Sequence, residues 1–338
     1  MSECHYDDGE SRICICEVVP ARAGANPPPL TPFNCHLHQT LCLQLHIDAY
    51  DDPSVPQRRS RRHTMPRFPH VFRLPTTRAA KRRRTMLAAV LTVLTVVTPF
   101  YFIYKPPNVL IRYFQHRWPD VLWHVPILSQ KEKVVALTID DAPSEYTRVI
   151  LKVLQENDAH ATFFVIGGQV QGRQNILEDV VKAGHQLGNH AMHDEPSRSL
   201  KPETLKAEVK KVEGYINSTY DAVGLPHPPR YFRPGSGFFS TRMREQIQEM
   251  EYQVVLGSVY PHDPQISYPM VNARHILSMV RPGSIIICHD RRKWTAPMLG
   301  KVLPELKRRG YRVTTVSGLL EASAKSKTPG SSEFARLT

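Results

Sequence analysis

From residue 132 onwards, short runs of apolar residues alternate with stretches in which apolar residues recur at helical spacing. Apolar runs of this length are typical of strands buried on both faces. We expect strands at 134–139, 161–166, 186–189, 230–232, 252–256, 284–288 and 311–316. The amphipathic stretches predict helices at 145–156, 175–183, 203–220, 242–250, 271–280 and 297–309. Such alternation of strands and helices indicates a parallel, barrel-like α/β fold rather than a sandwich.

Polar side chains follow three of these predicted strands directly. Asp140 and Asp141 follow the first strand, His190 and His193 the third, and His289 the sixth. Because the carboxyl ends of parallel strands share one face of such a fold, we expect these groups to converge. Two histidines and one carboxylate leave open positions on a divalent ion, which favours catalysis over a structural site. The second carboxylate is then free to accept a proton from water bound to the metal.

Two further motifs add candidate groups. Arg233 precedes Pro234-Gly-Ser-Gly237, where glycines allow the backbone to come close to a ligand. A surface turn bearing one arginine explains this motif equally well. His289, with the carboxylate of Asp290 available to fix its tautomer, suits a general acid for an amine leaving group. Adjacent acids at a strand end are also common as turns or helix caps, and single histidines as structural residues.

The chain before residue 132 has a different character. Met86–Tyr104 carries no charge and is about as long as a bilayer-spanning helix requires. The tract 53–85 contains no acid and many basic residues, and Lys81–Arg84 directly precedes the apolar run. This asymmetry predicts a signal-anchor with its basic flank in the cytosol and all residues after Lys105 translocated. A cleaved signal peptide and a buried core helix are the alternatives.

These patterns predict a single-pass membrane protein whose catalytic domain is extracellular or lumenal. In order, we expect a disordered basic region at 1–85, an anchor at 86–104, a linker at 105–131, a catalytic domain at 132–321 and a disordered tail at 322–338. Met65 would also start a chain with the same anchor. Only Cys288 follows the anchor, so the exported domain is expected to form no internal disulfide. The position of the basic tract assigns it to topology, and no nucleic-acid partner is expected.

The order and types of these residues resemble the NodB-homology polysaccharide deacetylases of carbohydrate esterase family 4. The resemblance covers about residues 134–316, with the five family motifs in order. It implies a deformed (β/α) barrel, here preceded by a single transmembrane helix, and removal of N-acetyl groups from chitin, peptidoglycan or related glycans. It also implies a divalent metal cofactor, with zinc first and cobalt or manganese as alternatives. The implied roles are Asp140 as base, Asp141, His190 and His193 as metal ligands, Arg233 as partner of the base, His289 as acid, Asp263 as partner of His289, and Ile287 as a lining of the acetyl pocket.

Several positions depart from the family pattern and concern the substrate cleft. Ala142-Pro143 stands where Gly-Pro is usual, Gly235 and Ser236 stand where proline and tyrosine are common, and the fourth motif lacks its tryptophan. The backbone N–H near Ser236 is the implied oxyanion donor. Tyr260 and Trp294, with Phe238 and Phe239, are candidate sugar platforms, although each also suits core or rim packing.

The leading hypothesis is therefore a membrane-anchored, metal-dependent N-deacetylase acting on chitin or chitin oligosaccharides as its acetylated glycan. A non-catalytic glycan-binding protein on the same fold and a small-molecule amidohydrolase are the alternatives, because the departures lie in the motifs that face the sugar. A glycosidase is disfavoured, since its two carboxylates would lie on opposite sides of the scissile bond rather than next to each other in sequence.

Overall fold

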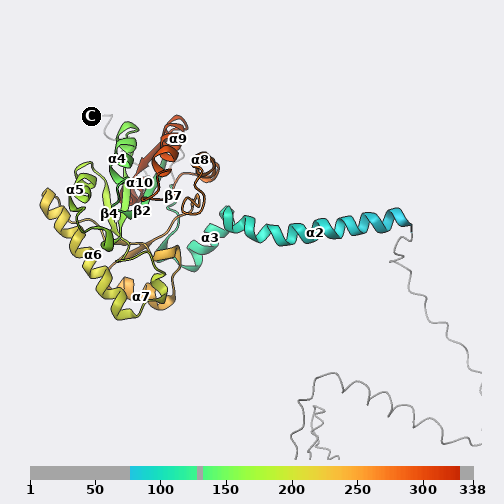
Figure 1. The fold of residues 1–338 in the computed structure, drawn as a ribbon, viewed down its shortest axis with the longest axis horizontal. Coiled ribbons are helices and arrows are strands. Elements are labelled where there is room, and N and C mark those ends of the chain that lie inside the picture. The colour runs from blue at the N-terminus through green and yellow to red at the C-terminus, as the bar shows by residue number, and fades with distance from the viewer. Residues whose placement is uncertain (1–76, 128–131, 328–338) are drawn as a thin grey trace, which may run out of the picture. The chain divides into compact units, whose positions relative to one another are not determined.

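The computed structural model describes residues 77–127 and 132–327 (Figure 1). Most of the predicted basic N-terminal region, part of the linker and most of the tail lie outside the described residues. All six predicted helices form within three residues of their expected ends. Two elements appear inside the predicted linker, a helix α3 (Asn108–Arg117) and a short strand β1 (Val121–Leu122). The C-terminal helix α10 (Val316–Lys327) begins at the end of the predicted last strand and continues into the predicted tail.

One parallel sheet forms the centre of the domain. Its strands follow the order β1-β6-β5-β4-β3-β2-β7, and β8 pairs with the start of β2 at Lys133–Ala136. The remaining strands are β2 (Lys133–Ala142), β3 (Ala161–Val165), β4 (Gln186–Asn189), β5 (Tyr231–Phe232), β6 (Gln253–Val255), β7 (Ile285–His289) and β8 (Tyr311–Thr314). Two isolated bridges, His124–Ser284 and Val259–Ile286, connect the segments that follow β1 and β6 to the beginning of β7. The sheet is thus a half-barrel, closed less completely than the predicted barrel.

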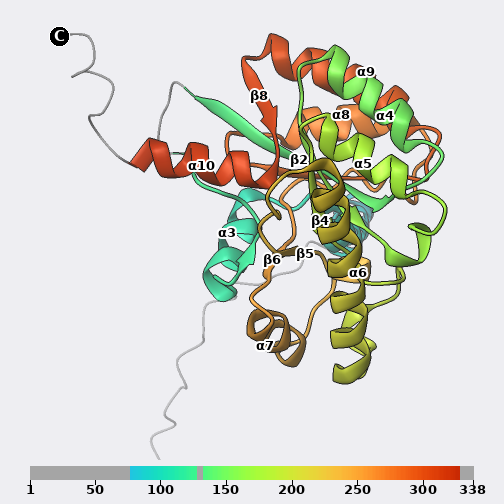
Figure 2. The same cartoon turned by 90° about the vertical axis from the view of Figure 1, so that its left-hand side faces the viewer.

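The helices cover the outside of this curved sheet (Figure 2). Helices α8, α9, α4, α5 and α6 pack against one another in that order, and α7 adjoins α6. Their bounds are α4 (Thr147–Glu156), α5 (Gln174–Lys182), α6 (Pro202–Val223), α7 (Thr241–Glu249), α8 (Pro269–Met279) and α9 (Thr295–Arg308). The longest of them, α6, begins with Pro202 and ends at Gly224 in the left-handed region, the usual signals for a helix start and stop.

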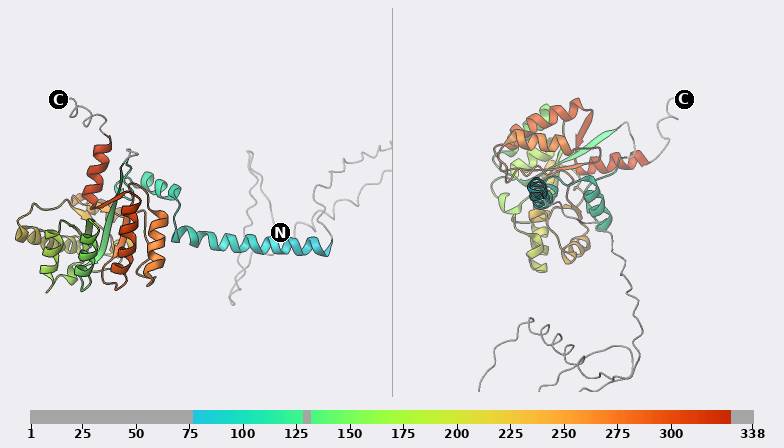
Figure 3. Two further views of the ribbon diagram at one scale, coloured as in Figure 1. Left: turned by 90° about the horizontal axis from the view of Figure 1, so that it is seen from above. Right: turned by 90° about the vertical axis from the view of Figure 1, so that its right-hand side faces the viewer.

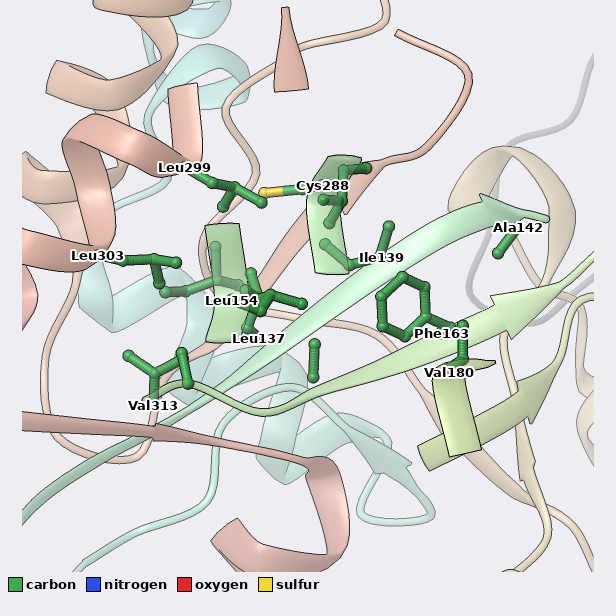
Figure 4. Close-up of a cluster of buried hydrophobic side chains, with 14 of the residues drawn as sticks. Leu137, Ile139, Ala142, Leu154, Phe163, Val180, Cys288, Leu299, Leu303 and Val313 are labelled. Atoms are coloured by element: carbon green, nitrogen blue, oxygen red, sulfur yellow. The ribbon is translucent and has the colours of Figure 1, made fainter. Parts of the chain in front are cut away.

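The main core lies between the sheet and these helices (Figure 4). Leu137 and Ile139 of β2 and Phe163 of β3 are fully buried there, against Leu154 of α4 and Leu299 of α9. Because β2 is buried along nearly its whole length, the charged groups at its carboxyl end are held on a rigid element. The apolar residues that bury β2 in the core therefore also fix the position of Asp140 and Asp141 at its end.

Helix α2 (Arg78–Tyr104) precedes this domain and starts eight residues before the predicted anchor. Among the described residues it is the one helix long and apolar enough to cross a membrane, a test that signal sequences also pass. None of its residues is buried. The alternative of a buried core helix is therefore wrong.

Candidate active site

The predicted polar groups meet at the carboxyl ends of β2, β4, β5 and β7. Strand β2 runs three residues past its predicted end, so Asp140 and Asp141 belong to the strand itself. Asp140 is in register with His289, the last residue of β7. The N–H of Asp290 donates to the carbonyl of Asp140 at 2.7 Å. Asp141 takes a positive φ of 65°, which turns the chain sharply beside the site.

Arg233 is buried beneath the site, with 2% of its surface exposed. Its Nη1 donates to Asp140 Oδ1 and to Thr138 Oγ1, both at 2.7 Å. Its Nε and Nη2 donate to the carbonyls of Val255 and Leu256 at 3.1 and 3.2 Å. The alternative of an exposed turn bearing one arginine is therefore wrong. The guanidinium instead fixes the carboxylate of Asp140 through one oxygen and leaves the other free of it.

His289 is oriented by Asp263. Its Nδ1 lies 3.0 Å from Asp263 Oδ1, and its backbone N–H donates to Asp263 Oδ2 at 2.8 Å. Its Nε2 lies 4.0 Å from Asp140 Oδ2. Burial alone would lower the pKa of His289, but Asp263, followed by Asp140 and Asp141, raises this pKa to about 9. The imidazole is therefore a cation at neutral pH, held with one nitrogen toward Asp140.

Asp290 does not orient the ring of His289, so that interpretation of the sequence is wrong. Its carboxylate accepts hydrogen bonds from Ser144 Oγ at 2.6 Å, from Thr147 Oγ1 and from the N–H of Arg291 at 2.8 Å. Asp290 thus connects the end of β7 to the loop that follows β2. Chain adjacency suggested the wrong partner because the side chains of neighbouring strand residues point to opposite faces.

Asp141 and His190 form the centre of a possible metal site. His190 Nε2 lies 3.9 Å from Asp141 Oδ1, and its Nδ1 lies 2.7 Å from the carbonyl of Arg233. A histidine that donates from Nδ1 to a carbonyl keeps its Nε2 lone pair for a metal. Asp141 Oδ1 is buried without a hydrogen-bond partner among the described residues, and burial raises the pKa of this carboxyl. An orphaned carboxylate oxygen beside a free imidazole nitrogen fits a divalent cation.

The third member of this cluster is Asp194. One ligand atom each from Asp141, His190 and Asp194 lies within 4.8 Å of the others. The side chain of His193 is exposed, and its ring lies beside Gly168 rather than in this group. Asp194 was not among the residues predicted from the sequence, although its spacing of four residues from His190 was a usable signal.

Of the remaining predicted residues, Tyr260 and Trp294 contact the pair His289 and Asp263. The Tyr260 ring meets that of His289 edge-on at 5.9 Å between centroids, and burial raises the pKa of Tyr260 to about 12. Ile287 is half-buried next to His289. Ser236 is exposed and has a φ of 56°. Trp294 donates its indole N–H to the carbonyl of Asp263 at 2.9 Å, so its polar edge supports the partner of His289.

Two features of the site had no clear sequence signal. Arg292 Nη2 lies 3.9 Å from Asp141 Oδ2, so a cationic side chain borders the possible metal site. Gly235 approaches the loop that carries Asp194, since a Cβ on this glycine would lie 2.0 Å from the carbonyl oxygen of Glu195. The glycine motif after Arg233 thus permits contact between two loops.

The known proteins that this chain resembles include several deacetylases of polysaccharides. The sequence pattern of the polysaccharide deacetylases matches residues 128–255. A peptidoglycan-N-acetylglucosamine deacetylase of Bacillus cereus is 34% identical over 206 residues, which cover 59% of this chain and 92% of that protein. A chitin deacetylase of Arthroderma benhamiae is 27% identical, over 55% of this chain and 51% of its own. The solved structure of the peptidoglycan deacetylase PdaC from Bacillus subtilis superposes with a TM-score of 0.53 at 27% identity, covering 58% of this chain and 94% of PdaC.

Proposed function

The chain belongs to the polysaccharide deacetylase family, carbohydrate esterase family 4, and we propose that it hydrolyses N-acetyl groups on a glycan that contains N-acetylglucosamine. One observation carries the proposal. A carboxylate fixed by an arginine, Asp140, and a histidine fixed by an aspartate, His289, face each other across 4.0 Å. Next to them lies the orphaned oxygen of Asp141. This arrangement provides a base, an acid and a cation site on one face.

We propose that Asp141 and His190 hold a divalent ion, with zinc first and cobalt or manganese as alternatives. When bound, such an ion supplies Lewis-acid activation of water and of the acetamide carbonyl. The loop after His190 supplies the third ligand. The family motif favours His193, whereas Asp194 lies closer to the other two groups. Metal stoichiometry of His193→Ala and Asp194→Ala, measured separately, identifies the ligand by the variant that loses the ion.

The residues of the chain then divide the proton transfers. Asp140 takes the proton of the attacking water, because Arg233 occupies only Oδ1 of its carboxylate. His289 gives a proton from Nε2 to the departing amine, and Asp263 on Nδ1 keeps the ring charged and in place. The backbone N–H near Ser236 would donate to the oxyanion. The base and the acid thus have partners of opposite charge: Arg233 holds Asp140, and Asp263 holds His289.

The substrate contacts follow from the side chains around this centre. We propose that Ile287 lines the acetyl pocket and that Tyr260, beside His289, packs on the sugar ring. Trp294 contributes its ring face, because its N–H is committed to Asp263. Chitin oligosaccharides are the first candidate substrate. The similarity to the Bacillus cereus enzyme makes peptidoglycan the second.

The first test is acetate release by the purified full chain from chitin oligosaccharides and, in parallel, from peptidoglycan. Release that a chelator abolishes and zinc restores would support the proposal, and comparison of the two polymers would choose the substrate. Asp140→Asn should keep the metal and lose turnover, whereas His190→Ala should lose both. Equal rates for Asp140→Asn and wild type would refute the assignment of the base.

A second candidate function is glycan binding without catalysis. The observation that favours it is Arg292, whose guanidinium lies close enough to Asp141 to offset its charge without a metal ion. Glycan binding with no acetate release from either polymer, whether or not zinc is added, would support this alternative. Acetate release would exclude it.

We also propose that α2 anchors the protein in a membrane, with the catalytic domain extracellular or lumenal. The support is the apolar helix α2, none of whose residues is buried, and the basic residues at its start. Resistance of the full chain to alkaline extraction from membranes tests the anchor. Release into the soluble fraction would instead favour a cleaved signal sequence.

A further inference from the structure

We propose that α3 and the start of α8 form a membrane-contact surface that holds the catalytic domain down on the bilayer. We call this surface the collar, and it consists of Val109, Tyr113, Tyr268, Met270 and Val271. The inference rests on the proposed anchoring of α2. The collar is an additional claim, because a domain joined to its anchor by a free linker would not need to contact lipid.

The end of α2 is fixed to α8. The Tyr104 ring stacks on His262 at 5.1 Å and meets His275 of α8 edge-on at 4.5 Å between centroids. His262 Nε2 lies 3.0 Å from the Tyr104 carbonyl, and Lys105 Nζ donates to Ser278 Oγ at 2.9 Å. Figure 3 shows α2 meeting the domain beside α3 and α8. The domain is therefore attached where the apolar helix ends.

The start of α8 exposes apolar side chains close to that attachment. Tyr268 is 69% exposed, Met270 47% and Val271 42%. Val271 precedes His275 by four residues, which is about 6 Å along a helix, and Tyr268 precedes it by about 10 Å. The exposed group is thus within two helical turns of the residue that contacts Tyr104.

Helix α3 adds a second exposed apolar pair on the other side of the attachment. It begins at Asn108, four residues after Tyr104. Val109 is 72% exposed and Tyr113 57%, and their spacing places them on one face of the helix. Neither α3 nor α8 contains an acidic residue, and α3 carries exposed Arg112. A short helix with exposed apolar and basic side chains is typical of the lipid headgroup layer.

The dimensions of α2 place the collar in that layer. Met86–Tyr104 spans about 28 Å as a helix, against about 30 Å for the hydrocarbon core of a bilayer. Tyr104 then lies at the edge of the hydrocarbon, where tyrosine is enriched. The headgroup layer is about 5–8 Å thick on each side, which is the scale of the distance to Val271. A bilayer, rather than a second protein, is the occupant because it is continuous with α2.

The test uses the full chain in phosphatidylcholine nanodiscs, with and without phosphatidylglycerol. Serine replaces the five N-terminal cysteines, and the fully buried Cys288 stays unlabelled. A single cysteine is introduced by Tyr113→Cys or Tyr268→Cys and labelled with an environment-sensitive dye. Val149→Cys on α4 is the matched control, since Val149 is 52% exposed on another face. Leu94→Cys within α2 reports on the anchor itself.

We expect dyes at 113 and 268 to emit at shorter wavelength and to be quenched by lipids spin-labelled in the headgroup region. The dye at 149 should show neither effect. The dye at 94, about 12 Å or more from either end of Met86–Tyr104, should instead be quenched by lipids spin-labelled near the middle of the acyl chain. If the dye at 94 is quenched while those at 113 and 268 behave like the control, the collar is refuted and the anchor stands. If the dye at 94 is also unquenched, both are refuted. Quenching only with phosphatidylglycerol would support the collar and assign its contact to the basic side chains.

Discussion

Asp263 is expected to set the pH range in which His289 can act as an acid. The pKa of His289 is raised from 6.5 to about 9, a difference worth about 3 kcal/mol at roughly 1.4 kcal/mol per pKa unit. Asp263 is the largest contributor that raises it. In Asp263→Asn the burial of the ring is opposed only by Asp140 and Asp141. The pKa of His289 should therefore fall to about 6.5 or lower.

The assay is the pH dependence of kcat/KM for acetate release. In the wild type the alkaline limb should lie near pH 9, where His289 loses its proton. In Asp263→Asn the limb should move toward pH 6.5, and the rate at pH 8 should fall about 30-fold because few molecules carry the proton. Asp290→Asn is the matched control, since this neighbouring carboxylate bonds Ser144 and Thr147 instead. Its limb should stay near pH 9.

The raised pKa of His289 also predicts how the free energy of unfolding changes with pH, and denaturation experiments can check the direction of this change. The folded pKa of His289 lies above its ordinary value, so the charged ring stabilises the wild type fully below about pH 6.5. This contribution is lost as the pH rises through about 9. Denaturant unfolding should therefore show the largest difference between wild type and Asp263→Asn at low pH. In the kinetic assay, alkaline limbs of kcat/KM at the same pH for the wild type and Asp263→Asn would refute the reasoning.

Three further substitutions test the surroundings of the site. Arg233→Lys should lower the free energy of unfolding by about 3 kcal/mol, since one ammonium cannot reach every buried acceptor that the guanidinium serves; guanidinium chloride unfolding measures this, and an unchanged midpoint would contradict it. Arg292→Gln should bind zinc more tightly, because it removes a cation 3.9 Å from Asp141; competition with a chelating dye checks the direction. Gly235→Ala should cost about 1–3 kcal/mol and weaken metal binding, because its Cβ would overlap the Glu195 carbonyl; equal zinc affinity would show that the loops move apart freely.

Much of the fold could be predicted from the sequence because its elements follow apolar periodicity. β2 exceeded its predicted length because Asp140 and Asp141 end the apolar run, although the ladder with β7 continues to Asp140 and the ladder with β3 resumes at Ala142. α3 and β1 were missed since α3 directly follows Pro106-Pro107 and β1 is only two residues long. Strand ends alone brought Asp141, His190 and His289 together correctly. The choice of Asp263 over Asp290 depends on side-chain direction, and the proximity of Arg292 depends on loop conformation, which spacing does not encode.

The hydrogen bonds of Asp290 bear on when the active centre forms during synthesis. Ser144 and Asp290 are 146 residues apart in the chain, yet the hydroxyl of one donates to the carboxylate of the other. The N–H of Asp290 also holds the carbonyl of Asp140. A growing chain therefore exposes its aspartate pair and His190 long before the segment that frames them. The proposed active centre is complete only when β7 has docked, so acetate release by this centre would report completion of nearly the whole domain.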